Sequence, residues 1–134
     1  GMKVLQFAFD SEDSQYLPHN YIANTVCYTG THDNMTTHQW LQELDADTKE
    51  YAEAYMQLRD GKDVWGVIRT AFASVSDLCI VPMQDYLMLS NEEGRMNVPA
   101  TAAGNWNWRI SPRYNTQARR MKILDIITRT NRCK

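Results

Sequence analysis

Three short apolar runs, separated by polar and helix-favouring sequence, constrain the fold of this chain more than any other feature. They are KVLQFAF at 3–9, TVCYT at 25–29 and LCIVPM at 78–83. None of them alternates cleanly between apolar and polar residues, which is typical of strands that are buried on both faces. Strands of that kind belong to parallel sheets, so the sequence predicts an α/β fold with parallel pairing.

Four other segments have helix-favouring patterns. The clearest is 64–76, where apolar residues recur at i, i+3 and i+4. Gly61 is expected to end the helix before it. In the last segment, either Met121, Leu124 and Ile127 or Ile123 and Ile126 can cover a core. The predicted helices are 36–44, 45–60, 64–76 and 116–130, and the first three have Thr36 or Thr37, Asp45 or Asp47, and Asp63 as expected caps.

The order of these segments is strand, loop, strand, helices, strand, loop and helix. That order is typical of βαβ units, whose parallel strands are joined by right-handed crossovers. The first two strands are an exception, because residues 10–24 between them contain no clear helix. Either this long loop carries function or the two strands are not simple neighbours. A chain of 134 residues has the size of one domain, and we treat 1–134 as a single unit.

Composition and charge exclude several classes of partner. The net charge of −2 gives no reason to expect nucleic acid or an anionic membrane. The sequence has no run of 18 apolar residues, and its first ten residues lack the apolar region of a signal peptide. Cys27, Cys79 and Cys133 are far apart and show no metal-binding spacing, which favours reduced thiols and a cytoplasmic location.

Polar clusters follow each of the three predicted strands. YLPHNY at 16–21 comes after the first, THDN at 31–34 after the second, and QD at 84–85 with GRMNVP at 94–99 after the third. Taken alone, each cluster is better explained by a turn, a loop or a helix start. Taken together, they favour a site, because the carboxyl ends of parallel strands share one face of a sheet or barrel.

The chemistry of that face favours a carbohydrate ligand. The sequence has no nucleophile elbow, no glycine-rich phosphate loop and no HExxH zinc spacing. Hydrogen-bonding groups mixed with Trp and Tyr are typical of sugar sites. Trp106 and Trp108 can be packing anchors or sugar platforms, and we favour packing anchors. The charged or titratable members of the predicted face are His19, His32, Asp33, Asp85 and Arg95.

Six sequence blocks are specific enough to indicate a family. They are GMKVLQFAF (1–9), YLPHNY (16–21), YTGTHDN (28–34), VPMQDYL (81–87), RMNVPAT (95–101) and GNWNWR (104–109). In order and spacing they resemble the 4-α-glucanotransferases, also called amylomaltases or disproportionating enzymes, of the α-amylase clan of glycoside hydrolases. The resemblance extends from residue 1 to about residue 125.

This resemblance implies that the chain is the carboxy-terminal portion of a (β/α)₈ barrel. The runs at 3–9, 25–29 and 78–83 would be barrel strands six, seven and eight. In the family, the nucleophilic aspartate follows the fourth strand and the acid/base glutamate follows the fifth, and neither segment lies in this sequence. The parent reaction transfers an α-1,4-glucan segment between maltodextrins with retention and without a metal or organic cofactor. The isolated chain is therefore expected to be inactive.

The resemblance also implies roles for individual residues. Asp33 matches the third carboxylate of the clan, which holds sugar hydroxyls and favours the oxocarbenium-like ring without acting as nucleophile or proton donor. His32 matches the neighbouring sugar-binding histidine. His19 and Asn97 match positions that line the glucan cleft, and Asp85 is given a structural place near the eighth strand. The candidate substrate-binding residues are His19, His32, Asn34, Arg95 and Asn97.

The sequence departs from the family pattern at two places near the implied cleft. Met35 stands where the family has an acidic residue, and MLSNEEGR at 88–95 replaces a more glycine-rich segment, with Tyr86 inside the QD-L pattern. Two interpretations stay open: a fragment of a glucanotransferase, or a stand-alone non-catalytic module that binds glucan or a protein. Since an incomplete barrel leaves strand edges exposed, self-association is expected in either case.

Overall fold

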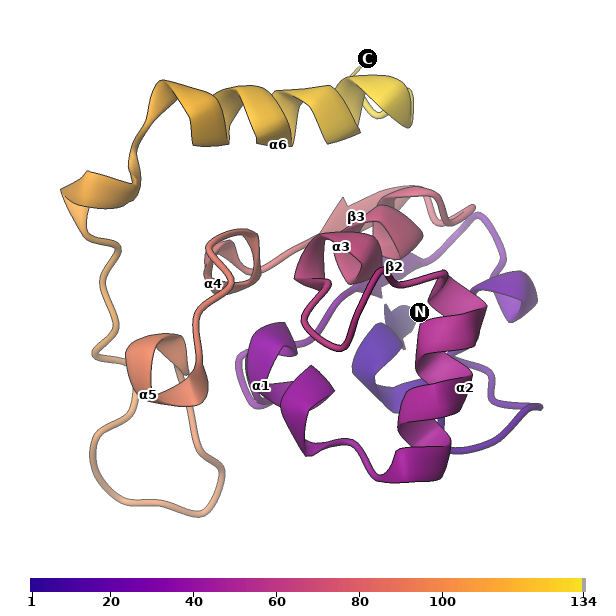
Figure 1. Ribbon diagram of the computed structural model, residues 1–134, viewed down its shortest axis with the longest axis horizontal. Coiled ribbons are helices and arrows are strands. Elements are labelled where there is room, and N and C mark those ends of the chain that lie inside the picture. Colours follow the sequence, from indigo (N-terminus) through magenta and orange to yellow (C-terminus); the bar gives the residue numbers. More distant parts are fainter. Residues whose placement is uncertain (134) are drawn as a thin grey trace.

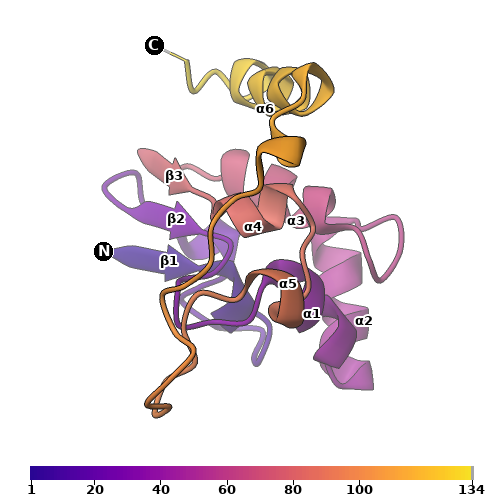
Figure 2. The same ribbon diagram turned by 90° about the vertical axis from the view of Figure 1, so that its left-hand side faces the viewer.

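The computed structural model describes residues 1–133 and places a three-stranded sheet at the centre of the molecule. Its strands are β1 (Met2–Val4), β2 (Val26–Tyr28) and β3 (Leu78–Ile80), in the order β1-β2-β3 and parallel throughout. Figure 2 shows the three arrows side by side and pointing the same way. The prediction of parallel pairing is therefore confirmed, and the first two strands are direct neighbours. Self-association through the edges of β1 and β3 stays a prediction.

All three strands are shorter than predicted, the second by one residue at each end and the first and third by more. After Val4 the chain turns into the 3₁₀ helix η1 (Leu5–Phe7), which the N–H of Ala8 closes on the carbonyl of Leu5 at 3.0 Å. Leu5, Ala8 and Phe9 are nonetheless buried. This run is apolar because it packs in the core, and burial alone does not distinguish a strand from a buried turn. The third strand likewise stops at Ile80, two residues before Pro82.

The four predicted helices are present. Thr36, Asp45 and Asp63 cap the first three, each with a side-chain oxygen that accepts a hydrogen bond from the backbone N–H three residues on. These caps were among the expected ones. The helices are α1 (Thr37–Glu43), α2 (Ala46–Met56), α3 (Val64–Phe72) and α6 (Gln117–Arg129).

Two helix ends differ from the prediction. α2 ends at Met56 instead of near Gly61, because Gln57 takes the left-handed conformation, at φ 53°, that glycine adopts more easily. α3 ends at Phe72 and does not continue to residue 76. The guanidinium of Arg132 donates to the carbonyls of Phe72, Ser74 and Ser76, at 2.8, 2.8 and 2.9 Å. These bonds satisfy carbonyls at and after the end of α3 that have no helical partner.

The connection between β3 and α6, for which the sequence predicts only a loop, contains three short helical turns. Ser90 and Glu93 form a reciprocal capping box at the start of the second of them. A further turn, η2 (Pro18–Asn20), lies in the loop between β1 and β2. The three turns are α4 (Met83–Tyr86), α5 (Asn91–Gly94) and η3 (Pro112–Tyr114).

α3 is the centre of the packing. It contacts α1, α2, α4 and α6, and its predicted i, i+3, i+4 apolar face is buried up to Phe72, whereas Val75, beyond the end of the helix, is exposed. Figure 1 shows α1 and α2 below it and α6 above it. The core is completed by residues of η1, α1 and α2. The buried members of the α3 face are Val64, Val67, Ile68, Ala71 and Phe72.

α6 is the least buried of the long helices. None of its residues is fully buried, and Ile126 and Ile127 pack only partly against the core. Met121 and Leu124 are exposed and Ile123 lines a surface pocket, so neither of the two predicted apolar sets covers a core as a whole. Figures 1 and 2 show α6 as an arm that stands off from α4. No helix within residues 1–133 is long and apolar enough to cross a membrane.

Candidate functional site

The loop that follows β2 is a tight turn with a fixed shape. The side-chain carbonyl of Asn34 accepts hydrogen bonds from the backbone N–H and the hydroxyl of Thr31, at 2.8 and 2.7 Å. A Cβ on Gly30 would displace the side-chain amide of Gln6 from its hydrogen bonds to Met35 and Thr37, which favours glycine there. The turn holds His32 and Asp33 outward, with roughly half of each side chain exposed. The candidate residue Asn34 thus builds the turn.

A second loop reaches this turn from far along the chain. The side-chain amide of Asn97 donates to Asp33 Oδ1 at 2.6 Å, and His32 Nε2 lies 3.3 Å from the same oxygen. Arg95 joins the two loops, because its guanidinium donates to the backbone carbonyls of Asp33 and Asn97, each at 3.0 Å. The structure therefore brings together His32, Asp33, Asn34, Arg95 and Asn97.

This arrangement leaves part of the Asp33 carboxylate open. Both side-chain contacts found within residues 1–133 reach Oδ1, from Asn97 and from His32. Oδ2 can therefore accept hydrogen bonds from a ligand. A half-exposed carboxylate that a neighbouring amide holds in one orientation is well suited to bind hydroxyl groups, since hydrogen bonds to charged groups are stronger than neutral ones.

Trp106 is the main residue of the site that sequence reasoning missed. Its side chain is 55% exposed, so its interpretation as a packing anchor is wrong. Its ring centroid lies 5.0 Å from that of His32. Its backbone is left-handed, at φ 63°, and its N–H donates to the carbonyl of Met96 at 2.7 Å. An exposed indole on a strained backbone is unfavourable for stability, and strained residues of this kind cluster at binding sites.

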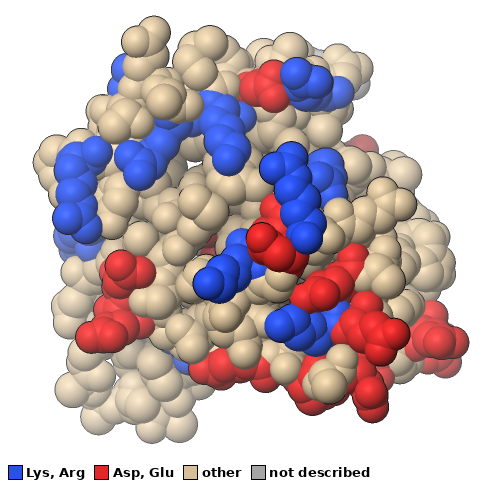
Figure 3. All heavy atoms as spheres, viewed as in Figure 1, with Lys and Arg blue, Asp and Glu red and all other residues tan. Residues whose placement is uncertain are grey.

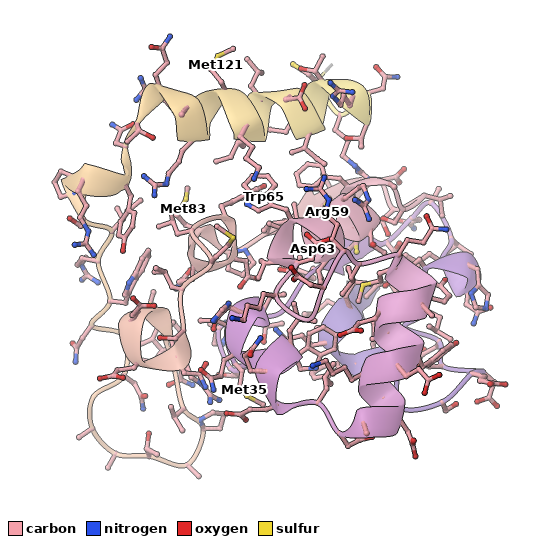
Figure 4. The ribbon with its side chains drawn as sticks, in the orientation of Figure 1. Met35, Arg59, Asp63, Trp65, Met83 and Met121 are labelled. Carbon is pink, nitrogen blue, oxygen red and sulfur yellow. The ribbon has the colours of Figure 1, made fainter. Side chains whose placement is uncertain are left out.

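His32, Asn34, Arg95 and Trp106 line a pocket of about 200 Å³ at the carboxyl ends of β2 and β3, and the Asp33–Asn97 pair lies next to it. That is smaller than the roughly 300–1,000 Å³ of complete small-molecule sites, so the pocket has the size of one part of a cleft. Met35, the departure from the family pattern, lies in its wall beside α1 (Figure 4). The pocket is lined on its polar side by Thr31, His32, Asn34, Gln84, Asp85 and Arg95, and on its apolar side by Met35, Pro82, Met96 and Trp106.

Asp85 is a buried residue of the pocket lining, and its role is structural. It is 2% exposed, and its carboxylate accepts hydrogen bonds from the Thr29 hydroxyl at 2.6 Å and from the Thr37 N–H and hydroxyl at 2.8 and 2.7 Å. These bonds clamp the end of β2 to the start of α1. Burial raises the pKa of the Asp85 carboxyl, while the hydrogen bonds from Thr29 and Thr37 oppose that rise.

Gln6 supports the same region from beneath. Its side-chain amide donates to the carbonyl of Met35 at 2.9 Å and to the Thr37 hydroxyl at 3.4 Å. Sequence reasoning did not assign it a role. The signal was a single polar residue inside the apolar run KVLQFAF, since a buried amide must find partners.

His19 is the one candidate residue that the structure does not bring to the cluster. Its Nδ1 lies 2.9 Å from the hydroxyl of Tyr55 in α2, and the two rings are 5.8 Å apart. The pocket is lined by Gly94 and Arg95 at the end of α5. Figure 1 shows α2 and α5 on opposite sides of α1, so the contact with α2 keeps His19 away from the pocket. Within residues 1–133, no three His, Cys, Asp or Glu side chains are grouped as metal ligands would be.

Known proteins resemble the chain in both sequence and structure. The 4-alpha-glucanotransferase of Synechocystis sp. is 49% identical over 115 residues, which are 84% of this chain and 23% of that protein. The enzyme of Clostridium butyricum is 43% identical over 137 aligned residues, which cover 100% of this chain and 28% of that protein. The amylomaltase of Streptococcus agalactiae, solved in complex with acarbose, matches with a TM-score of 0.92 and 40% identity, over 98% of this chain and 27% of that one.

The lengths of these matches show how much of a longer protein this chain corresponds to. It spans about a fifth of the Arabidopsis thaliana relative and slightly more than a quarter of the Clostridium butyricum one. Its α/β arrangement with a small parallel sheet thus matches one portion of an amylomaltase. The sequence profile of 4-alpha-glucanotransferase matches residues 1–116, which is most of the chain. The chain therefore belongs to the 4-alpha-glucanotransferase family.

Proposed function

We propose that residues 1–134 form the carboxy-terminal portion of a 4-α-glucanotransferase barrel and supply one wall of its α-1,4-glucan site. β1, β2 and β3 would be strands six, seven and eight of that (β/α)₈ barrel. The observation that carries the proposal is the cluster in which Asn97 and His32 converge on the Asp33 carboxylate, next to the pocket that His32 helps to line. Barrel enzymes place their sites at this end of the strands.

Asp33 would act through hydrogen bonds to substrate and not through covalent chemistry. Its open Oδ2 can accept from hydroxyls of the sugar ring at the point of cleavage. A charge-assisted hydrogen bond of this kind contributes roughly 1.5–3 kcal/mol, and it accelerates the reaction if it tightens as the ring becomes oxocarbenium-like. Asn97 and His32 keep the carboxylate in one orientation, so little reorganisation is needed in the transition state.

The remaining pocket residues would position the glucan. Arg95 ties the two loops together, and this keeps Asn97 within reach of Asp33. The exposed indole of Trp106 beside His32 offers an apolar face against which a pyranose ring can pack. In the reaction that the family carries out, the nucleophile and the acid/base catalyst would come from outside residues 1–134.

Calorimetry with maltoheptaose tests this function. The chain offers part of a cleft, so we expect a dissociation constant in the millimolar range or weaker, about −4 kcal/mol at most. Asp33→Ala should remove the binding. Asp125→Ala, on the solvent-exposed surface of α6, is the matched control and should leave it unchanged. Equal affinities for Asp33→Ala and the unmodified chain would contradict the proposal.

A stand-alone glucan-binding module is the second candidate. It is favoured by the hydrogen bonds among Thr31, Asp33, Asn34, Arg95 and Asn97, which hold the two loops of the site against each other. A site assembled without outside help can bind without a second wall. The same titration separates the two candidates, because a micromolar dissociation constant would favour the module over the partial cleft.

A further inference from the structure

Two of the three cysteines, which are far apart in the sequence, lie side by side in the sheet. Cys27 is the central residue of β2, Cys79 is the central residue of β3, and the two are register partners in the parallel pairing. Figure 2 shows these strands as neighbouring arrows. Because register partners on parallel strands direct their side chains to the same face of a sheet, both thiols lie on the face that packs against the core.

The two thiols are in direct contact, and both are reduced in the structure. The S–H of Cys79 donates a hydrogen bond to the sulfur of Cys27, which lowers the pKa of the Cys27 thiol although burial opposes that effect. The same hydrogen bond, together with burial, raises the pKa of the Cys79 thiol. Two sulfurs that share a hydrogen bond need only a small displacement to become bonded to each other.

A positive charge lies next to this pair. The guanidinium of Arg132 is fixed by its hydrogen bonds to the carbonyls of Phe72, Ser74 and Ser76, and its charge acts to lower the pKa of both thiols. Arg132 follows α6. Figure 3 shows Lys and Arg gathered over η3 and α6, whereas acidic residues gather at the lower right, over α2. A nearby cation favours the thiolate, which is the nucleophilic form of cysteine.

The pair can be reached by a small oxidant. Cys27 is fully buried, but Cys79 is only half-buried, and β3 forms an edge of the sheet within residues 1–133. Hydrogen peroxide is small and neutral, so it can approach through the partly open side at Cys79. A protein disulfide is too large to make the same approach.

The spacing of the strands predicts that a disulfide here would be strained. Neighbouring strands lie about 4.7–4.9 Å apart, whereas the Cβ atoms of a disulfide are about 3.5–4.5 Å apart. Forming the bond must therefore draw the centres of β2 and β3 together. Strained disulfides are the ones that small thiols reduce most easily. Two residues beyond Cys27, Thr29 donates its hydrogen bond to Asp85, so the link would lie directly beneath the candidate glucan site.

We propose that Cys27 and Cys79 are a site of reversible oxidation, at which a peroxide converts the two thiols into a disulfide that ties β2 to β3. One sulfur, as thiolate, attacks a peroxide oxygen, the O–O bond breaks, and the hydroxide that leaves takes up a proton as water. The other sulfur loses its proton and displaces the hydroxyl of the sulfenic acid as a second water. The proposal goes beyond glucan transfer and does not depend on the proposed function.

Peptide mapping of a Cys133→Ser chain tests this oxidation. The substitution removes the exposed cysteine, which would otherwise join two chains, and leaves only the pair. The folded variant is treated with hydrogen peroxide, alkylated in denaturant and cut with trypsin, which places Cys27 in peptide 4–49 and Cys79 in peptide 70–95. We expect these peptides to be joined, at the sum of their masses less two hydrogen atoms. The thiols that alkylate should fall from two to none, and glutathione at millimolar concentration should restore both.

The matched control is Cys79→Ser in the same Cys133→Ser background, which should give no joined peptide. Circular dichroism melting before and after treatment checks that each chain stays folded. Two thiols that still alkylate after the folded chain meets peroxide would overturn the proposal, and so would sulfinic acid at Cys79 without a link. Joined peptides that form only in denaturant would show that the fold does not bring the thiols together. A link that resists millimolar glutathione would contradict reversible oxidation.

Discussion

Incubated with maltotriose, the 134-residue chain is expected to release no glucose above a buffer blank. Retaining transfer between glucans needs two carboxyl groups about 5–5.5 Å apart, one as nucleophile and one as acid/base. The candidate site offers Asp85 in the pocket wall and Asp33 next to the pocket. Asp85 is 2% exposed and holds three hydrogen bonds to Thr29 and Thr37, so it cannot reach a sugar ring. One accessible carboxylate cannot perform both roles.

Glucose release is followed with a coupled assay at high protein concentration over a day. The control is Asp33→Ala, which separates activity of this chain from a contaminating glucosidase. Release of glucose and longer maltodextrins by the unmodified chain, absent from Asp33→Ala, would show that the chain is catalytic by itself. That result would contradict the interpretation of Asp33 as a transition-state-stabilising residue that needs partners from outside the chain.

Asp85→Ala is expected to lower the free energy of unfolding by about 3 kcal/mol, because it removes the acceptor of three buried hydrogen bonds. The hydroxyl of Thr29 and the N–H and hydroxyl of Thr37 would then be buried without the Asp85 carboxylate as their hydrogen-bond acceptor. Urea denaturation followed by circular dichroism measures the loss. Asp33→Ala is the matched control, because it truncates the other carboxylate at the strand ends. The Asp33 side chain is half-exposed, so this substitution should lower the free energy of unfolding by less than about 1 kcal/mol.

Burial of the Asp85 carboxyl also predicts how the free energy of unfolding changes with pH. Burial raises the pKa of Asp85 in the folded state, so between its unfolded and folded pKa values the native state holds a proton that the unfolded state has lost. The contribution of Asp85 to stability is therefore fully present below the unfolded pKa, about 4, and is lost as pH rises through the folded pKa. Asp85→Asn should flatten this dependence. A variant whose stability changes with pH as steeply as that of the unmodified chain would contradict the assignment.

The elements that sequence predicted well are those in which local chemistry and burial agree. Asp45 and Asp63 are strong caps that precede helix-favouring sequence, and α2 and α3 begin directly after them. The non-alternating apolar runs correctly indicated parallel strands. The cluster at the strand ends followed from the same pairing, since parallel strands bring their carboxyl ends together.

The elements that sequence missed depend on tertiary contacts. Leu5 and Phe9 are apolar because they pack in the core, and nothing in the run shows that the backbone turns after Val4. Gln57 ends α2 in a left-handed backbone conformation that glycine usually adopts, so the sequence pointed to Gly61 instead. Trp106 reaches His32 through a long loop whose path no local pattern specifies. His19 follows the first predicted strand in the sequence, but the path of its loop places its ring against Tyr55 of α2.

The most direct test of the glucan site is a maltoheptaose titration followed by two-dimensional ¹H–¹⁵N NMR of the chain. The indole N–H of Trp106 and the side-chain amide of Asn97 lie on either side of His32 and Asp33 and report on the pocket. The indole of Trp65, beneath Lys122 on the α6 side, is the internal control. We predict that the Trp106 and Asn97 signals shift together at millimolar glucan while Trp65 stays still. Shifts confined to Trp65, or none at glucan concentrations far above the millimolar range, would contradict a glucan site at Asp33.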